Sequence, residues 1–257
     1  MCPGEVNRSV GGPLPVPPQS DIAIVVPVFG DTPRLHALID RVRSWPEQPR
    51  EIIVVSAAED PELRAFCETS GCRYLESRRC RGAQLDSGAR AAQAPVLWFL
   101  HADAAPHPSS LKDVAQTLAD GAEGGHFRFR FTGASSWRKA LIEWLVNIRV
   151  QLGGIPYGDQ GLFVRREAYL ECGGFPHQPL FEEVALVKKL RERKRFRPCQ
   201  KPIGVSPRRW ERDGWVRRSL ANRRLAIRYV LGTTAEQLAG SYDQTNGTPT
   251  TSTELKR

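Results

Sequence analysis

The sequence predicts an α/β fold: a mixed, mainly parallel sheet with helices on both faces and a basic helical segment at the C-terminus. Short apolar runs alternate with stretches of helical periodicity in repeats of roughly 25–30 residues, which is the pattern of βαβ units. Residues 94–100 are apolar throughout, as in a strand buried on both faces of a parallel sheet. The chain has 257 residues, enough for one large domain with a full core.

The first half of the chain predicts strands that alternate with helices. A proline in the first turn suits a helix start, so Asp60 and Pro61 predict an N-cap and the first helical position. The expected helices are one carrying Leu35, Leu38, Ile39 and Val42, a second starting at Asp60, and a third over residues 82–93. The expected strands are residues 22–27, 51–55, 72–75 and 94–100.

The second half is less regular. Residues 125–131 alternate with period two, which predicts a strand with one apolar and one basic face. A further strand is expected at 161–164, and a helix within 180–195 that begins with acids and ends with bases. Two amphipathic helices are expected, with apolar stripes formed by Trp137, Leu141, Trp144, Leu145, Ile148 and Leu152, and by Val216, Leu220, Ile227 and Leu231.

Charge is concentrated in one segment. Residues 188–228 carry 16 basic and three acidic side chains, whereas the chain as a whole has a net charge of +9. Such a block suits phosphate groups, nucleic acid or an anionic membrane surface, although a solvated helical face is an equally good interpretation. It has no recognisable nucleic-acid-reading motif, so no nucleic-acid partner is expected.

Composition also indicates the cellular location of the protein and the boundaries of its domain. Six scattered cysteines without a C-x-x-C pair argue against a zinc site and for reduced thiols in a cytoplasmic protein. No apolar run approaches the ~18 residues of a membrane span, and the N-terminus does not resemble a secretory signal. The expected organisation is a flexible leader over 1–20, one domain over 21–243 and a disordered tail over 244–257.

His101 and Asp103 stand together where the most apolar strand ends. In open α/β sheets, ligands bind outside the carboxyl ends of the strands, so an acid there is a candidate ligand-binding group. Alternatively, Asp103 caps the helix that follows near Ser109 and Ser110.

Seven short motifs in a fixed order resemble a known family. They occupy residues 27–31, 54–60, 81–89, 99–103, 157–161, 173–176 and 180–183. Their order and spacing are similar to those of family-two glycosyltransferases of the GT-A fold, and most similar to the compact bacterial branch found beside radical-SAM and selenium-related genes. The resemblance covers residues 22–242 and implies a hexosyltransferase-like enzyme that inverts the anomeric centre.

The resemblance implies a nucleotide-sugar donor and a divalent metal, Mg or Mn, which carboxylates and phosphate oxygens would share. The family's metal-binding Asp-x-Asp motif reads His101-Ala102-Asp103 here, so Asp103 is the expected metal ligand. Ser56 stands where the family has an acid. Helix capping by Asp60 and structural packing of Trp210 are the alternatives to donor contacts. The expected donor contacts are Pro27, Asp31, Ser56, Asp60, Arg81, Gln84, His101, Asp103, Arg209 and Trp210.

The resemblance also implies a general base, because an acceptor hydroxyl must lose a proton during inverting transfer. Glu183 occupies the second position of the family's acidic pair and is expected to be this base. Glu182, Asp159 and Gln160 are expected on the acceptor side. Alternatively, Glu182 and Glu183 are acids favoured at a helix N-terminus.

Two other functions remain open from the sequence. A nucleotidyltransferase would share the fold, but residues 27–32 lack the basic side chain that such enzymes place after the first strand. A non-catalytic descendant that binds nucleotide or a partner is favoured by Ser56 and His101.

The acceptor is unknown, and a lipid-linked acceptor is one hypothesis. The stripe that contains Trp137 and Trp144 would ordinarily be core, yet tryptophan flanked by basic residues also suits a membrane interface. Peripheral contact with the inner membrane face is the corresponding hypothesis about location.

Overall fold

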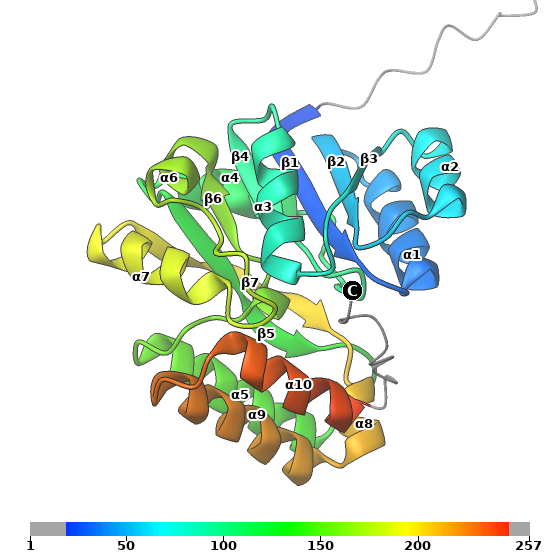
Figure 1. The fold of residues 1–257 in the computed structure, drawn as a ribbon. Coiled ribbons are helices and arrows are strands. Elements are labelled where there is room, and N and C mark those ends of the chain that lie inside the picture. The colour runs from blue at the N-terminus through cyan, green and yellow to red at the C-terminus, as the bar shows by residue number, and fades with distance from the viewer. Residues whose placement is uncertain (1–18, 247–257) are drawn as a thin grey trace, which may run out of the picture.

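The computed structural model describes residues 19–246, which form a seven-stranded sheet covered by helices on both faces (Figure 1). The strand order is β3-β2-β1-β4-β6-β5-β7. Only β6 runs antiparallel to its neighbours, β4 and β5, whereas the other pairs are parallel. The predicted mixed, mainly parallel sheet is therefore confirmed. The strands are β1 (Gln19–Val28), β2 (Gln48–Ser56), β3 (Arg73–Glu76), β4 (Val96–Phe99), β5 (Gly124–Phe131), β6 (Phe163–Arg165) and β7 (Phe196–Val205).

Side-chain alternation along the strands builds two cores. In β1, Ile22 and Ile24 face one core, and Ala23 and Val25 face the other. On the first face lie α1 (Thr32–Arg43), α2 (Pro61–Thr69) and α4 (Ser110–Ala119); on the second lie α3 (Arg81–Ala91), α6 (Arg166–Glu171) and α7 (Glu183–Glu192). Because both faces are covered, the central strands read as continuous apolar runs.

The edge strand β7 was not predicted from the sequence. Its sequence contains Pro198 and Pro202, which lack a backbone N–H and normally argue against a strand. An edge strand tolerates prolines, because the backbone groups on its outer side form no hydrogen bonds to a neighbouring strand. The short helices α6 and α8 (Arg208–Asp213) were not expected either.

Helix α5 (Trp137–Gln151) packs on the edge of β5 rather than on a sheet face. β5 pairs with β6 only at Gly124 and Gly125, so its outer backbone groups need other partners. Asn147 accepts a bond from the Phe129 N–H and donates one to its carbonyl, and Glu143 accepts from the Phe131 N–H. These contacts turn Asn147 and Glu143 toward the sheet. The expectation that the tryptophan stripe is core is therefore wrong, and most of that stripe is exposed.

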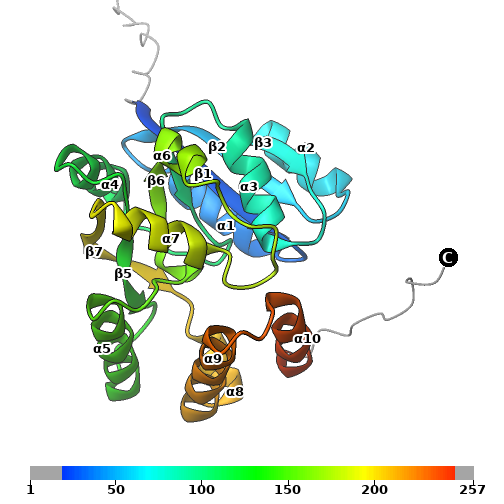
Figure 2. The same cartoon turned by 60° about the vertical axis from the view of Figure 1, so that its left-hand side comes forward.

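The C-terminal helices extend from the end of the sheet that also carries α5 (Figures 1 and 2). They are α8, α9 (Trp215–Val230) and α10 (Ala235–Asn246). α10 continues past residue 243, so its last three residues fall in the segment expected to be tail. The rest of that tail and the leader up to residue 18 lie outside the described residues. No helix within 19–246 has the length and apolarity needed to cross a bilayer.

Candidate functional site

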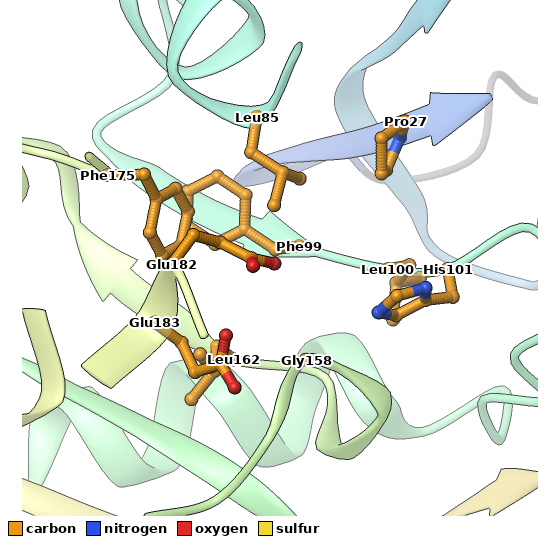
Figure 3. Close-up of a pocket in the computed structure, with 10 residues that line it drawn as sticks. All are labelled: Pro27, Leu85, Phe99, Leu100, His101, Gly158, Leu162, Phe175, Glu182 and Glu183. Atoms are coloured by element: carbon orange, nitrogen blue, oxygen red, sulfur yellow. The ribbon is translucent and has the colours of Figure 1, made fainter. Parts of the chain in front are cut away.

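The candidate site lies where the ends of β1 and β4 meet the N-terminal ends of α3 and α7. Parallel strands place their carboxyl ends at one edge, and the loops that follow them form the pocket of Figure 3. The glutamates of the acidic pair lie across this pocket from His101 (Figure 3). The lining residues are Pro27, Leu85, Phe99, Leu100, His101, Gly158, Leu162, Phe175, Glu182 and Glu183.

The two glutamates of the pair are both buried but have different partners. Arg81 donates to both carboxylate oxygens of Glu182, at 2.5 Å from Nε and 2.9 Å from Nη2. In contrast, Oε2 of Glu183 is buried and has no hydrogen-bond partner among the described residues. A bidentate arginine stabilises the charged form of Glu182, whereas Glu183 has no such ion pair of its own.

Burial raises the pKa of Glu183 from 4.5 to about 8, and repulsion by Glu182 adds to this effect. Glu183 is therefore a carboxyl group that holds its proton near neutral pH and faces a pocket. Phe181, immediately before the pair, has a φ of +60°, which is rare for a bulky residue. It stacks on Tyr229 of α9 with the ring centroids 4.5 Å apart. This contact helps to hold the strained turn that presents the pair.

His101 and Asp159 face the site from the β4 loop and from η1 (Gly158–Gln160). Burial lowers the pKa of His101 to about 3, with Arg81 and Arg209 contributing. His101 is thus a neutral hydrogen-bonding group. Gly158 leaves room for it, since a Cβ there would lie 2.8 Å from Nε2 of His101. Burial raises the pKa of Asp159 to about 6.

Asp31 and Asp103 share one arginine. Nη2 of Arg208 lies 3.6 Å from Oδ2 of Asp31 and 3.7 Å from Oδ2 of Asp103. Asp103 does not cap α4, whose N-cap is Ser109, so that alternative is wrong. Arg208 directly precedes the expected donor contacts Arg209 and Trp210, but it was not itself expected at the site. Its position shows two loops converging on a single cation.

A divalent metal fits this arrangement in part. Within residues 19–246 no cluster of three or more histidine, cysteine or acidic side chains could hold a metal ion. The guanidinium of Arg208 nevertheless stands as a cation between two carboxylates. Mg²⁺ and Mn²⁺ sites that use substrate phosphates commonly need only one or two protein carboxylates. The residues therefore suit a metal that is completed by a ligand's phosphate oxygens.

Several residues that were expected to contact the donor instead form hydrogen bonds to backbone carbonyls around the site. The Gln84 amide is buried and donates to the carbonyls of Val28 and Val55, at 3.0 and 2.8 Å, which ties together the ends of β1 and β2. The Ser56 hydroxyl donates to the carbonyl of Ala58. Their hydrogen-bonding capacity toward a ligand is correspondingly reduced.

Asp60 caps α2 by accepting from the N–H of Leu63 at 2.9 Å, which confirms the capping interpretation. Trp210 lies in a cluster with Phe129 and Phe131, and its indole N–H donates to Ser219. The Trp210 ring is thus buried in apolar packing, which fits the structural alternative and leaves little of its surface for the expected donor contact.

Gln160 is also buried; it donates to the carbonyl of Phe127, and its Oε1 has no partner among the described residues. Pro27 lines the pocket directly. Arg209 is close enough to lower the pKa values of His101 and Asp159. The site thus brings together Pro27, Arg81, His101, Asp159, Arg209, Glu182 and Glu183, with Asp31 and Asp103 linked through Arg208.

A second buried network, missed from the sequence, supports the loop before the acidic pair. Asp86 accepts from the Tyr169 hydroxyl at 2.8 Å, from Arg90 at 2.8 Å and contacts His177 at 3.2 Å. Gly174 approaches Asp86 so closely that a Cβ would lie 2.6 Å from its Oδ1. The sequence did contain a signal for this network. Asp86 is an acidic residue among the small residues of the motif at 81–89, which forms a largely buried helix.

Solved structures resemble this fold at low sequence identity. TarS 1–349 of S. aureus gives a TM-score of 0.56 and 12% identity over 72% of this chain and 60% of that chain, so this chain spans less than two thirds of it. Glucosyl-3-phosphoglycerate synthase from Mycobacterium tuberculosis, bound to phosphoglyceric acid, gives a TM-score of 0.54 and 18% sequence identity. That match covers 72% of this chain and 71% of the synthase chain. Its complex with Mn²⁺, UDP and glucosyl-3-phosphoglycerate gives 0.53 and 16% over the same shares.

At these identities the likeness concerns the fold. No curated protein matches this sequence. A family model described as Glycosyl transferase family 2 matches residues 23–174, more than half of the chain, and this region contains the first five strands of the sheet together with β6. The chain therefore belongs to glycosyl transferase family 2, and its sheet and flanking helices have the GT-A fold expected from the motifs.

Proposed function

We propose that this protein transfers a hexose from a nucleotide-diphosphate donor to an acceptor hydroxyl, with inversion and with the help of Mg²⁺ or Mn²⁺. Glu183 is the observation that carries the proposal. It is a buried carboxyl group, set on a pocket at the carboxyl edge of a parallel sheet, and its Oε2 has no hydrogen-bond partner within residues 19–246. Family membership supplies the reaction class.

The ionised form of Glu183 acts as the general base in this proposal; its raised pKa makes this form a minority near neutral pH, and its share grows as pH rises toward 8. Its carboxylate takes the proton of the acceptor hydroxyl as the oxygen attacks the anomeric carbon, while the bond between that carbon and the diphosphate oxygen breaks. Glu182 cannot easily share this role, because Arg81 holds both of its oxygens. Asp159 and Gln160 line the acceptor side, and Asp159 is the next candidate for the base.

The donor lies along the loops after β1, β2 and β4. Asp31 and Asp103 face its ribose and diphosphate, and Arg209 supplies positive charge near the leaving group. His101, neutral at physiological pH, offers a hydrogen bond without charge. Structural neighbours were solved with UDP, UDP-glucose and UDP-GlcNAc, so uridine nucleotides are the first donors to test.

Asp103 is the protein ligand in the proposed metal site, with Asp31 facing the same cation position. A divalent ion bound there would neutralise negative charge on the departing diphosphate. In its absence Arg208 balances the two carboxylates. If donor and metal bound there, Arg208 would be free to pair with phosphate oxygens instead.

The proposal keeps three further expectations from the sequence. The motifs resemble those of the compact bacterial branch of the family, and the cysteine usage favours a cytoplasmic enzyme. The acceptor would be lipid-linked, which requires a protein surface that lies against a bilayer. A catalytic role is preferred over the non-catalytic alternative because a descendant without activity has no need to keep Glu183 unpaired and buried.

The direct test is to incubate the purified protein and Mn²⁺ with a panel of nucleotide sugars and to measure release of the nucleoside diphosphate. Release from one donor, lost in Asp103→Asn, supports a transferase. Release of pyrophosphate from a sugar phosphate and a nucleoside triphosphate would instead indicate a nucleotidyltransferase. Tight nucleotide binding without any turnover would favour the non-catalytic alternative.

Glu183→Gln should lower turnover by about 10²–10⁴-fold, because the amide cannot accept the acceptor's proton. Donor binding should remain, as measured by calorimetry with the nucleoside diphosphate and Mn²⁺. Glu182→Gln should have a smaller effect on turnover, and Glu171→Gln, on the far side of α6, should have none. Normal turnover in Glu183→Gln together with loss in Asp159→Asn would move the base to Asp159.

The raised pKa of Glu183 predicts a pH-dependent stability. Between 4.5 and about 8 the folded protein holds a proton that the unfolded chain has released, so the free energy of unfolding should fall as pH rises through this range. Glu183→Gln removes this contribution and should gain stability relative to wild type on going from pH 5 to pH 8.5, by on the order of a few kcal/mol. Urea titrations at both pH values measure it; a pH-independent difference would contradict it.

Arg208→Gln should tighten Mn²⁺ binding in the absence of nucleotide by about tenfold, a usual size for coupling between competing ligands. The substitution leaves Asp31 and Asp103 without their shared cation. Paramagnetic titration of free Mn²⁺ measures the affinity, and Arg212→Gln, which removes an equal charge from the same helix, is the control. Unchanged affinity in Arg208→Gln, or full binding in Asp103→Asn, would argue against this site.

A further inference from the structure

Helix α5 exposes an unusually apolar face. Because Asn147 and Glu143 bind the edge of β5, the stripe that contains Trp137 and Trp144 turns away from the sheet. Apart from the half-buried Ile148, the exposed fractions of its side chains run from 48% for Leu141 to 83% for Leu152. Soluble proteins rarely leave two tryptophans and several leucines exposed on one helix, unless that surface meets a partner.

Helix α9 exposes a second such face. Val216, Leu220 and Ile227 recur at helical spacing and are each at least 47% exposed, and Leu231 just beyond the helix is 79% exposed. The inward side of α9 is occupied by Trp215 and by Arg218, which pairs with Asp213. Both helices extend from the same end of the sheet (Figures 1 and 2). We call their exposed apolar residues, together with the arginines of α9, the α5/α9 surface.

The charge of α9 identifies the kind of partner. The helix contains five arginines and no acid, and four of them, Arg217, Arg223, Arg224 and Arg228, are exposed. A second copy of the chain seated on this face would bring two such helices together and their charges would repel. Apolar side chains flanked by arginine, with tryptophan among them, match an anionic lipid surface.

The α5/α9 surface is linked to the acidic pair. Tyr229 of α9 stacks on Phe181 and accepts a hydrogen bond from Gln178 at 3.3 Å, and both partners belong to the loop that leads into Glu182. A bilayer seated on α9 would thus lie one aromatic contact away from the turn that presents the pair. This placement suits an acceptor held in the membrane.

We propose that the α5/α9 surface docks the protein on anionic membranes. The tryptophans and aliphatic residues enter the interfacial layer, and the arginines of α9 bind lipid phosphates. The inference goes beyond the proposed glycosyl transfer and does not depend on it, because docking needs neither donor nor metal.

Co-sedimentation with vesicles tests the proposal, using phosphatidylglycerol mixed with phosphatidylcholine against phosphatidylcholine alone, without nucleotide. The full chain should bind the anionic vesicles, and binding should weaken steeply as salt rises. Trp137→Ala/Trp144→Ala should reduce partitioning at least about tenfold through lost apolar insertion. Arg223→Gln/Arg224→Gln should reduce it by about thirtyfold, because each basic side chain near an anionic surface contributes about a factor of five.

Matched controls separate the α5/α9 surface from general effects. Leu170→Ala removes an exposed apolar side chain from α6, and Lys112→Gln/Lys188→Gln removes two exposed charges from α4 and α7. Both should bind as wild type does. Thermal unfolding checks that each variant is folded, and the arginine variant stands as an independent test if the tryptophan variant is not.

Three results would overturn the proposal. One is absence of binding to anionic vesicles at low salt. Another is equal loss of binding in the controls and in the α5/α9 variants. The third is a stable dimer by sedimentation that dissociates in Trp137→Ala/Trp144→Ala, which would assign the surface to a second copy. Because nucleotide release is not measured, failure here would argue against the lipid-linked acceptor but would leave the proposed sugar transfer itself unaffected, and failure of the transfer would leave docking unaffected.

Discussion

The bidentate ion pair between Arg81 and Glu182 is the interaction on which the site depends. It joins the first residue of α3 to the N-cap of α7, two positions about a hundred residues apart in the chain. A buried glutamate without this partner would be costly, and a buried pair of glutamates would be worse. By neutralising one member, Arg81 makes it possible to bury the other. Burial, the main cause of the raised pKa of Glu183, therefore depends on this ion pair between α3 and α7, although the charge of Arg81 by itself lowers that pKa.

The same contact shows why two adjacent acids have different environments. Both glutamates line the pocket, but the guanidinium of Arg81 holds Glu182 and not Glu183. The left-handed backbone of Phe181 sets the turn that precedes the pair, and the aromatic rings of Tyr157 and Tyr229 both contact the Phe181 ring. Tyr229 comes from α9, outside the family match. The C-terminal helices are therefore part of the site's support, although they lie at the far end of the chain.

Much of the fold could be predicted from the sequence because the central strands are buried on both faces. β1, β2 and β4 follow the expected apolar runs to within a few residues. β7 was missed because its prolines are tolerated only at a sheet edge, and edge position is a property of the whole sheet. The burial of α5 was misjudged for a related reason. An apolar stripe normally marks the buried side of a helix, but here the polar Asn147 and Glu143 complete an unpaired strand edge.

The sequence predicted which residues lie near the site better than it predicted the hydrogen bonds that they form. The order of the motifs brought Pro27, His101, Asp103 and the glutamates together correctly. The sequence could not show that the Gln84 amide donates hydrogen bonds to two backbone carbonyls, because these bonds require α3 to lie across the ends of two strands. Its bond to both β1 and β2 has a consequence for redesign. The loops that carry Asp31 and Ser56 are both held by Gln84, so a change that moves one loop is expected to shift the other. Altering ligand preference in this scaffold would thus require the two loops to be changed together, with Gln84 kept as their common tether.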